Sequence, residues 1–216
     1  MIVLAVANTK GGVGKTTLTA ALAVRAAQES ARVAIVDLDP QRSLVAWWQR
    51  RGESENPCIF NGAGTAADAV EALRLTGWDW VFLDGPPAFL TTVEEALDVA
   101  DLAIVPIKPS MLDMIATRDA LVLAHRTKTP VIAVLNDCHK DRLTAAARNT
   151  LEGEKIYVAA TEVMHRVSHI SGMTVGKTGP EVNNGRDKAA AEEINTLWGE
   201  VKAAALKAVK DRAAAA

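Results

Sequence analysis

One glycine-rich stretch near the start of the chain combines the residue types that bind phosphate groups. Residues 10–17 read KGGVGKTT and lie between an apolar run and a helix-forming stretch. Glycines let the backbone turn tightly and aim its N–H groups at phosphate oxygens, and the positive end of the following helix attracts the same anions. The ammonium of Lys15 can reach the β- and γ-phosphates of a nucleotide, and the Thr16 hydroxyl can ligate Mg²⁺. The stretch therefore predicts a nucleotide-binding loop with contacts from Gly11, Gly12, Val13, Gly14, Lys15, Thr16 and Thr17.

The loop departs from the ordinary Walker A pattern, because Thr9 stands where that pattern places its first glycine. A second lysine, Lys10, lies near the start of the loop instead. In this respect KGGVGKTT resembles the phosphate loop of the ParA/MinD family of P-loop ATPases. The resemblance implies ATP and Mg²⁺ as cofactors, and it implies that Lys10 reaches across a nucleotide-sandwich dimer to the partner's phosphates. A cation supplied in this way ties γ-phosphate binding to dimerisation, as an arginine finger does.

Two acids follow the second apolar run of the chain, in the segment DLDPQ at residues 37–41. This segment resembles switch I of the same family. The resemblance implies that Asp39 positions or activates the attacking water, with Asp37 nearer the Mg²⁺ ligands. A simple turn at the end of a strand is the alternative, since Asp and Pro are common there. Arg42 stands where family members usually have glycine, and we expect it in solvent or against a partner.

A third acid, Asp84, ends the apolar segment WVFLD at residues 80–84. An apolar strand that ends in an acid is the Walker B arrangement, which holds Mg²⁺ directly or through water. The Gly-Pro-Pro sequence at residues 85–87 would then be switch II; the alternative is an acid that caps a strand–helix turn. The resemblance thus implies the catalytic residues Lys10, Lys15 and Asp39 and the metal ligands Thr16, Asp39 and Asp84.

Two further strand ends carry candidate nucleotide contacts. The segment PIKPSMLD at residues 106–113 resembles a family segment that shapes the dimer interface and the nucleotide edge, which makes Pro109 a candidate. A loop with a helix N-cap at Ser110 or Asp113 is the alternative, and both interpretations can hold. The amide of Asn136 can donate and accept at once, which suits an adenine edge, and family members bind adenine from this position. For Asn136 the alternative is a turn at the end of a strand.

These motifs lie at the ends of apolar runs that are typical of buried strands. The predicted strands cover residues 2–7, 32–37, 80–84, 102–107 and 131–136, and the predicted helices between them cover 16–29, 43–51, 66–76, 91–99 and 112–126. Continuous apolar strands that alternate with helices predict a mostly parallel, twisted sheet with helices on both faces. Ligands bind such sheets at the carboxyl ends of the strands, where the motifs lie. We therefore expect an α/β fold, a single-domain P-loop NTPase over residues 1–216.

The last third of the chain is less regular. Its pattern predicts a helix at 141–151, a short strand at 156–159, a helix or turn at 162–171, a loop at 172–185 and a final helix at 187–212. Candidates for a patch that contacts DNA phosphates without reading sequence are Arg166, Lys177, Arg186 and Lys188. Ordinary solvated charge is the alternative for each of them. His165 and His169 are four residues apart but lack the acid of an HExxH motif, so we expect no metal site there.

Composition limits the classes of function. The chain has 216 residues, of which 49% are hydrophobic and 23% charged, so it is long enough to bury a core and is not of disordered composition. Cys58 and Cys138 are isolated, which argues against a zinc framework or a shared iron–sulfur cluster. The net charge is −2, with 12 basic and 16 acidic residues in 1–138 and 12 basic and 10 acidic in 139–216. No apolar run reaches the ~18 residues of a membrane span, and the start lacks the basic region of a signal peptide.

Two function classes fit these motifs. The first is a ParA-type ATPase, cytoplasmic and nucleoid-associated, that hydrolyses ATP slowly, forms a homodimer with ATP and binds DNA non-specifically. A ParB-like or ribbon-helix-helix partner or a cargo adaptor would stimulate it, and its cargo would be a plasmid, a chromosome or a protein cluster. Because the chain begins at its first strand, we expect no amino-terminal DNA-binding extension. The alternative is a MinD-like membrane-associated positioning ATPase, but residues 199–216 offer mostly alanine on their apolar side, so we expect no stable membrane binding.

Overall fold

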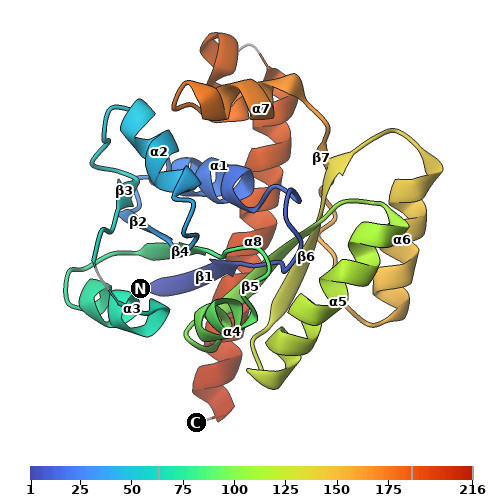
Figure 1. Ribbon diagram of the computed structural model, residues 1–216, viewed down its shortest axis with the longest axis horizontal. Helices are drawn as coiled ribbons and strands as arrows, with labels where there is room; N and C mark the ends of the chain where they lie inside the picture. Colours follow the sequence, from blue (N-terminus) through green and yellow to red (C-terminus); the bar gives the residue numbers. More distant parts are fainter. Residues whose placement is uncertain (63, 186, 216) are drawn as a thin grey trace.

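Among the residues that the structure describes, seven strands form one parallel sheet at the centre of the protein (Figure 1). The computed structural model describes residues 1–62, 64–185 and 187–215. The strands lie in the order β3-β2-β4-β1-β5-β6-β7, and each neighbouring pair is parallel. Their bounds are β1 Ile2–Val6, β2 Val33–Asp37, β3 Cys58–Ile59, β4 Trp80–Asp84, β5 Leu102–Ile107, β6 Val131–Cys138 and β7 Val163–Met164.

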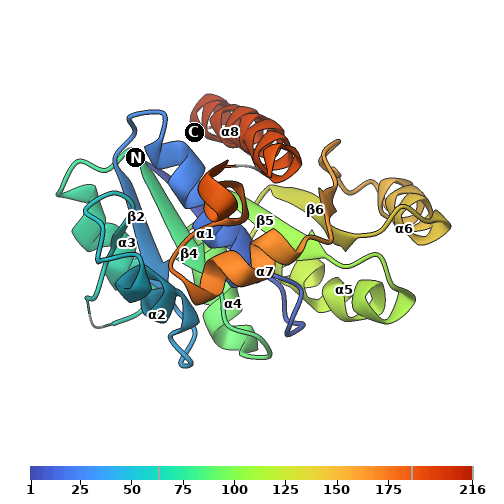
Figure 2. The same ribbon diagram turned by 90° about the horizontal axis from the view of Figure 1, so that it is seen from above.

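Helices cover both faces of this sheet. Within the described residues they are α1 Lys15–Ala27, α2 Ser43–Arg50, α3 Ala66–Arg74, α4 Leu90–Asp98, α5 Met111–Arg126, α6 Arg142–Gly153, α7 Val167–Thr174 and α8 Lys188–Ala215. A 3₁₀ helix, η1, spans Gly179–Gly185. Figure 2 shows α8 on one side of the sheet and α4 and α5 on the other. The predicted α/β fold with helices on both faces is confirmed.

The sheet divides the hydrophobic core into two halves. Successive side chains of a strand point to opposite faces, so Leu4 and Val6 pack with α1, α2 and α8, whereas Val3 and Ala5 pack with α3, α4, α5 and α6. These four residues of β1 are fully buried. Burial on both faces explains why the strands read as continuous apolar runs in the sequence.

The last third differs from the sequence prediction in three places. The expected strand at 156–159 contributes a single bridge, Val158 to Ala133, and the seventh strand is Val163–Met164, inside the segment predicted as a helix or turn. The expected loop at 172–185 contains the end of α7 and all of η1. Outside the last third, the short edge strand β3 was not predicted either. Each missed element is short, so it has too few residues to show a hydrophobic period.

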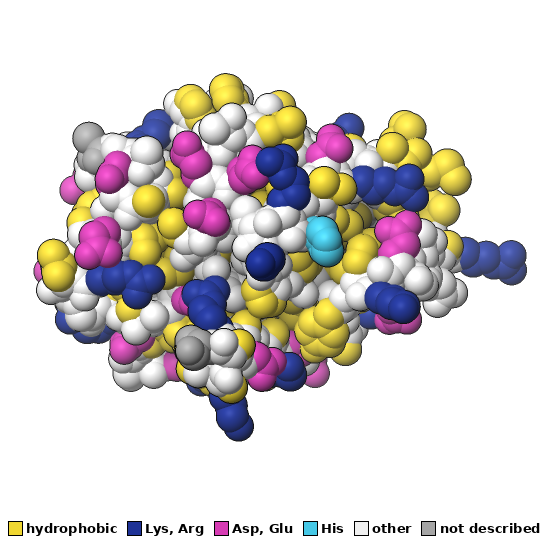
Figure 3. Space-filling view, turned by 90° about the horizontal axis from the view of Figure 1, so that it is seen from below, with side chains coloured by type: hydrophobic (Ala, Val, Ile, Leu, Met, Phe, Trp, Pro, Cys, Tyr) yellow, Lys and Arg dark blue, Asp and Glu magenta, His cyan; other side chains and the backbone are white. Residues whose placement is uncertain are grey.

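The surface mixes charges and apolar side chains. On the face drawn in Figure 3, basic and acidic side chains alternate, and hydrophobic ones gather on the side that carries α5 and α6. None of the helices that the structure describes is both long and apolar enough to cross a bilayer.

Candidate functional site

The predicted phosphate loop lies between the carboxyl end of β1 and the start of α1. Gly12 and Gly14 adopt φ values of 75° and 90°, in the left-handed region that a glycine enters without strain. A Cβ atom on Gly14 would lie 2.3 Å from the side-chain nitrogen of Asn136, so any other residue would also collide there. Asn136 donates from that nitrogen to the carbonyl of Val13 at 2.7 Å. The end of β6 therefore holds the tip of the loop in place.

Asn8 anchors the other end of the loop, a role that the sequence reasoning missed. This side chain is fully buried, and its nitrogen donates to the Pro106 carbonyl at 2.8 Å and to the Thr117 hydroxyl at 3.0 Å. Its oxygen accepts from the backbone N–H of Lys10 at 2.9 Å. Asn8 thus ties the loop to β5 and α5. The available signal was a lone polar residue directly after an apolar strand.

The two lysines of the loop lie in different surroundings. Lys15 is buried, and its Nζ donates to the carbonyl of Lys10 at 3.0 Å, so its side chain folds back across the loop. Burial lowers the pKa of Lys15, while the carboxylates of Asp84 and Asp39 act in the opposite direction. The Lys10 side chain is 43% exposed, with Nζ 3.9 Å from a carboxylate oxygen of Asp113 at the start of α5. One lysine therefore lies inside the site, and the other faces outward.

Asp84 lies at the centre of the site, beside the start of α1. Its carboxylate is almost fully buried and accepts hydrogen bonds from the hydroxyls of Thr16 at 2.8 Å and Thr19 at 2.9 Å. Burial raises the pKa of Asp84 to about 7, because a buried carboxylate loses its hydration and the two hydroxyls replace only part of it. A cation nearby would stabilise its charged form.

The oxygen donors at this point suit Mg²⁺. Thr16 and Asp84 present hydroxyl and carboxylate oxygens, which are the hard ligands that this ion prefers. Within the described residues no three His, Cys, Asp or Glu side chains form a metal-binding group. In proteins, Mg²⁺ is usually held by one or two carboxylates together with substrate phosphates.

Asp37 and Asp39 do different work. Asp37 ends β2 in register with Asp84 and accepts from the backbone N–H groups of Leu44 and Val45, at 3.1 and 3.0 Å, so it caps the start of α2. Burial raises the pKa of Asp37, and the backbone N–H groups of Val45 and Asp39 counteract that shift. Asp39 is half-buried and close enough to Lys15 to influence its pKa. The geometry thus gives Asp37 a structural task and leaves the Asp39 carboxylate beside the loop.

Arg42 is exposed, as expected, and its backbone adopts φ 54°. Its guanidinium donates to the Asp37 carbonyl at 3.2 Å and to the Asn61 side chain at 3.3 Å. Arg42 therefore braces the segment between β2 and α2 from outside.

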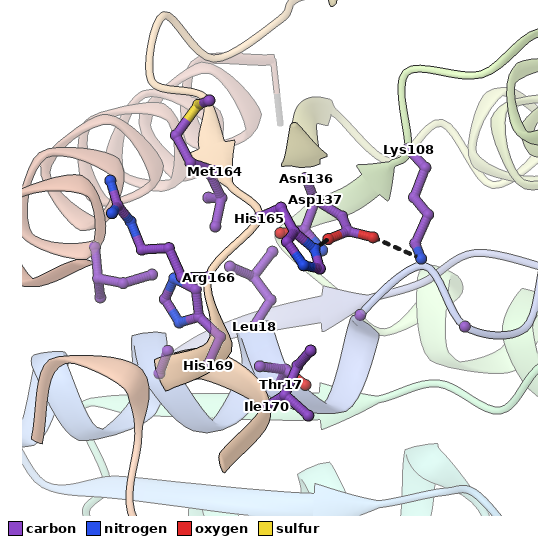
Figure 4. A pocket seen from close by; sticks show the side chains of 15 residues that line it. Thr17, Leu18, Lys108, Asn136, Asp137, Met164, His165, Arg166, His169 and Ile170 are labelled. Carbon is purple, nitrogen blue, oxygen red and sulfur yellow. Dashed lines mark hydrogen bonds and ion pairs between the residues drawn. The ribbon is translucent and has the colours of Figure 1, made fainter. Parts of the chain in front are cut away.

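A cavity of about 390 Å³ opens beside the loop (Figure 4). Gly12, Gly14 and Thr17 line it on the loop side, and apolar residues of α1, α7 and α8 also line it. Asn136 also lines the cavity, and its contact with adenine stays a prediction from the resemblance. Lys108, Asp137 and His165, which the sequence did not single out as site residues, lie at the same cavity (Figure 4).

Pro109 lies elsewhere. It lines a separate groove of about 420 Å³ between α5 and α6, together with Met114, Leu143 and other mainly apolar residues. The segment before α5 also contains the expected N-cap, since the Ser110 hydroxyl accepts from the backbone N–H of Asp113. The nucleotide contact predicted for Pro109 stays a prediction from the resemblance.

The candidate DNA-contacting residues do not form one free patch. The Arg166 guanidinium makes a two-pronged ion pair with Glu193, and Asp187 lies 3.9 Å away. These acids neutralise it and raise its pKa. Lys177 and Lys188 are exposed. Arg186 lies outside the described residues. In this conformation Arg166 braces β7 against α8 and offers no free charge to DNA.

Comparisons with known proteins identify the family. A model described as the CobQ/CobB/MinD/ParA nucleotide-binding domain matches residues 4–180. The chain is 31% identical over 214 residues to the maintenance of carboxysome distribution protein A of Halothiobacillus neapolitanus, covering 92% of this chain and 95% of that protein. It is 32% identical over 134 residues to the chromosome-partitioning ATPase Soj of Thermus thermophilus, covering 49% of this chain and 54% of Soj.

Solved structures share the fold. The MinD cell division protein of Aquifex aeolicus superimposes with a TM-score of 0.75 at 17% identity, covering 94% of this chain and 98% of that chain. An ATP complex of a McdA variant from Cyanothece superimposes with a TM-score of 0.71 at 15% identity, covering 94% and 96%. Since the family model covers most of the chain and the Halothiobacillus relative nearly all of it, the protein belongs to the ParA/MinD family of nucleotide-binding ATPase domains.

Proposed function

We propose that this protein is a ParA-type positioning ATPase. In this proposal it forms a sandwich dimer with ATP, binds DNA without sequence preference and releases it after slow, Mg²⁺-dependent hydrolysis. The observation that carries the proposal is the pair of lysines in the phosphate loop, with Lys15 buried in the site and Lys10 facing outward. An outward lysine at the edge of a nucleotide site is placed to serve a second protomer.

Within the site each residue has a proposed task. The loop glycines present backbone N–H groups to the phosphates, and Lys15 leaves the Lys10 carbonyl to pair with them. Thr16, Asp84 and Asp39 would hold Mg²⁺, which when bound neutralises charge on the phosphate oxygens. Asp39 would orient the attacking water. Lys10 would leave Asp113 and pair with the phosphates bound by the partner protomer.

The relatives support one cargo class. The protein whose printed name is maintenance of carboxysome distribution protein A matches this chain along almost its whole length, whereas the Soj match covers about half. That difference favours a protein-cluster cargo over a plasmid or a chromosome. A cargo adaptor, in the place that a ParB-like or ribbon-helix-helix protein would take, would then stimulate hydrolysis. The proposal places the protein in the cytoplasm, on the nucleoid.

The final helix bears on the membrane-bound alternative. The apolar side of α8 is buried through Ile194, Leu197, Trp198 and Val201. Near its end, Arg212 donates to the Asp101 carboxylate at 2.9 Å and to the Ala100 carbonyl at 3.1 Å. A helix whose apolar face packs on its own sheet has little left to insert into a bilayer. This packing favours DNA over a membrane as the surface on which the protein moves.

The direct test of this function is binding to random-sequence duplex DNA with ATP, with ADP and without nucleotide, at two salt concentrations. The proposal predicts binding with ATP alone, weakened strongly by salt, because phosphate contacts release counterions. Anionic liposomes serve as the parallel sample. Binding to liposomes in place of DNA would move the assignment to a MinD-like protein, and binding to neither would contradict a surface-based positioning ATPase.

A further inference from the structure

Three side chains form a continuous chain of polar contacts at the cavity beside the phosphate loop (Figure 4). The Lys108 Nζ lies 2.7 Å from one carboxylate oxygen of Asp137. The other carboxylate oxygen lies 2.5 Å from Nδ1 of His165. All three residues line the same cavity as Gly12 and Gly14. A lysine that is not part of the glycine loop therefore faces the same space as the loop does.

The strand order of the sheet brings these three side chains together. Lys108 directly follows β5, Asp137 lies near the end of β6, and His165 directly follows β7. In a parallel sheet these ends lie along one edge, which is also the edge that carries the phosphate loop. Figure 4 shows the Lys108 side chain reaching down from β5 toward the loop before α1.

Asp137 is held in an unusual conformation. Its φ is 60°, in the left-handed region that non-glycine residues seldom adopt, although Asp tolerates it better than most. Burial opposes its charged form, but the hydrogen bonds and charges of Lys108 and His165 hold the pKa of Asp137 below its usual value. Asp137 is thus a carboxylate anion that forms an ion pair with the ammonium of Lys108.

The two cations that line the cavity differ in how firmly they are held. Arg166 is fixed by the two hydrogen bonds that it donates to Glu193 and by the nearby carboxylate of Asp187. For Lys108, Asp137 is the one acid within 4.0 Å among the described residues, and the Lys108 side chain is 34% exposed. An ammonium carries three donors on a flexible stem, so Lys108 can turn without breaking a network on which the fold depends.

We propose that Lys108 is a further nucleotide-binding residue, which contacts the phosphate chain, and that Asp137 holds it at the rim of the cavity until the nucleotide enters. This inference rests on the proposed nucleotide-binding function. In the free protein the Lys108–Asp137 pair carries no net charge. When phosphates bind beside the loop, their oxygens replace the Asp137 carboxylate as the partner of the ammonium, while His165 keeps its contact with Asp137. Lys108 then supplies positive charge in addition to that of Lys15.

The test compares two variants that both lack the carboxylate and differ only in the lysine. They are Asp137→Asn and the double variant Asp137→Asn with Lys108→Gln, because Lys108→Gln alone would leave Asp137 as an unpaired anion and weaken binding for that reason. Lys140→Gln, which removes an exposed lysine outside the cavity, is the matched control. The affinity for Mg²⁺–ADP is measured by calorimetry at low and high KCl, and circular dichroism checks that each variant is folded.

The double variant should bind ADP about 10-fold more weakly than Asp137→Asn, as expected for the loss of one charged hydrogen bond. The difference should shrink at high KCl, since salt screens an exposed charge pair. Lys140→Gln should bind like the wild type. Equal affinities for the two Asp137 variants would overturn the inference. A loss that salt does not change would assign Lys108 to the sugar or base and overturn the phosphate contact. Wild-type protein that binds no ADP would instead contradict the proposed function.

Discussion

At the scale of single residues, Asp84 and Lys15 both have pKa values that burial shifts toward the uncharged form. Its carboxylate lies buried between two threonine hydroxyls, and burial raises its pKa to about 7. Lys15, next to it, has its pKa lowered by the same burial. In the nucleotide-free protein, the charged form of each group is therefore raised in free energy. Such a cost is typical of a site built to receive a charged ligand.

The raised pKa of Asp84 predicts how stability changes with pH. The folded-state pKa of about 7 lies above the ordinary value of 3.8, so the folded state holds this proton more firmly than the unfolded state does. The contribution of Asp84 to stability is thus fully present below pH 3.8 and is lost as the pH rises toward 7. Asp84→Asn removes this loss, and should raise the stability of the nucleotide-free protein at pH 8 by roughly 1–3 kcal/mol, but hardly at pH 4.

Thermal unfolding at pH 4 and pH 8 checks this prediction. A gain of this size corresponds to a Tm increase of about 2–10 °C at pH 8 for a chain of this length. Asp98→Asn, at an exposed acid, is the control and should change little at either pH. A lower Tm for Asp84→Asn at pH 8 would show that the carboxylate is charged and well stabilised in the free protein.

At the scale of elements, the end of α2 is held against η1 and against the segment that connects α7 to η1. The Trp47 Nε1 donates to the Lys177 carbonyl at 3.0 Å, and Arg51 makes two hydrogen bonds of 2.8 Å with Glu181. A Cβ atom on Gly176 would lie 2.2 Å from the backbone nitrogen of Arg51, so the two segments are in close contact. Because α2 begins only a few residues after Asp39, these contacts help to position the switch segment at residues 37–41.

Removing the two hydrogen bonds from Arg51 to Glu181 should therefore destabilise the fold. Arg51→Met leaves Glu181, which is largely buried, without its cation, at an expected cost of about 2–4 kcal/mol. Burial opposes the charged form of Glu181, but Arg51 and the N–H of Thr178 hold its pKa below 4.5. The contribution of Glu181 is thus present above pH 4.5 and lost as the pH falls through its lower folded-state pKa, so the effect of the variant should shrink in acid.

Urea unfolding at pH 7 and at pH 3 measures this difference. Arg50→Met, at the exposed neighbour, is the matched control and should cost less than about 0.5 kcal/mol. If Arg51→Met is as stable as the wild type at pH 7, the ion pair between Arg51 and Glu181 contributes nothing to holding α2.

The elements of the fold were predictable to different degrees. The strands that carry Asp37, Asp84 and Asn136 were found from the sequence, because burial on both faces makes each a continuous apolar run. The strand β7 was not found, since two residues show no period, and neither was the role of Asn8. Lys108, Asp137 and His165 meet only through the strand order, and no spacing in the sequence reveals that order.

At the scale of the whole molecule, the proposed DNA-binding surface needs exposed basic side chains. With Arg166 neutralised by Glu193, the exposed Lys177 and Lys188 are the remaining candidates among the described residues. Replacing both by alanine should weaken ATP-dependent DNA binding a few-fold and lower the slope of log K against log salt by about two per protomer, if each contacts a phosphate. Lys210→Ala, at an exposed lysine near the end of α8, is the control.

Filter binding across a salt series gives both quantities. An unchanged slope for the double variant would place the DNA surface elsewhere on the molecule, whatever the change in affinity.

We infer that ATP joins two copies of this chain through Lys10. The molar mass in solution, measured by light scattering with ATP and Mg²⁺ and with ADP, tests this directly. The wild type should double its monomer mass of 22.9 kDa with ATP alone. Lys10→Ala should remain a monomer with ATP while binding ADP as the wild type does, since Lys10 lies outside its own site. A Lys10→Ala variant that dimerises like the wild type would contradict the claim.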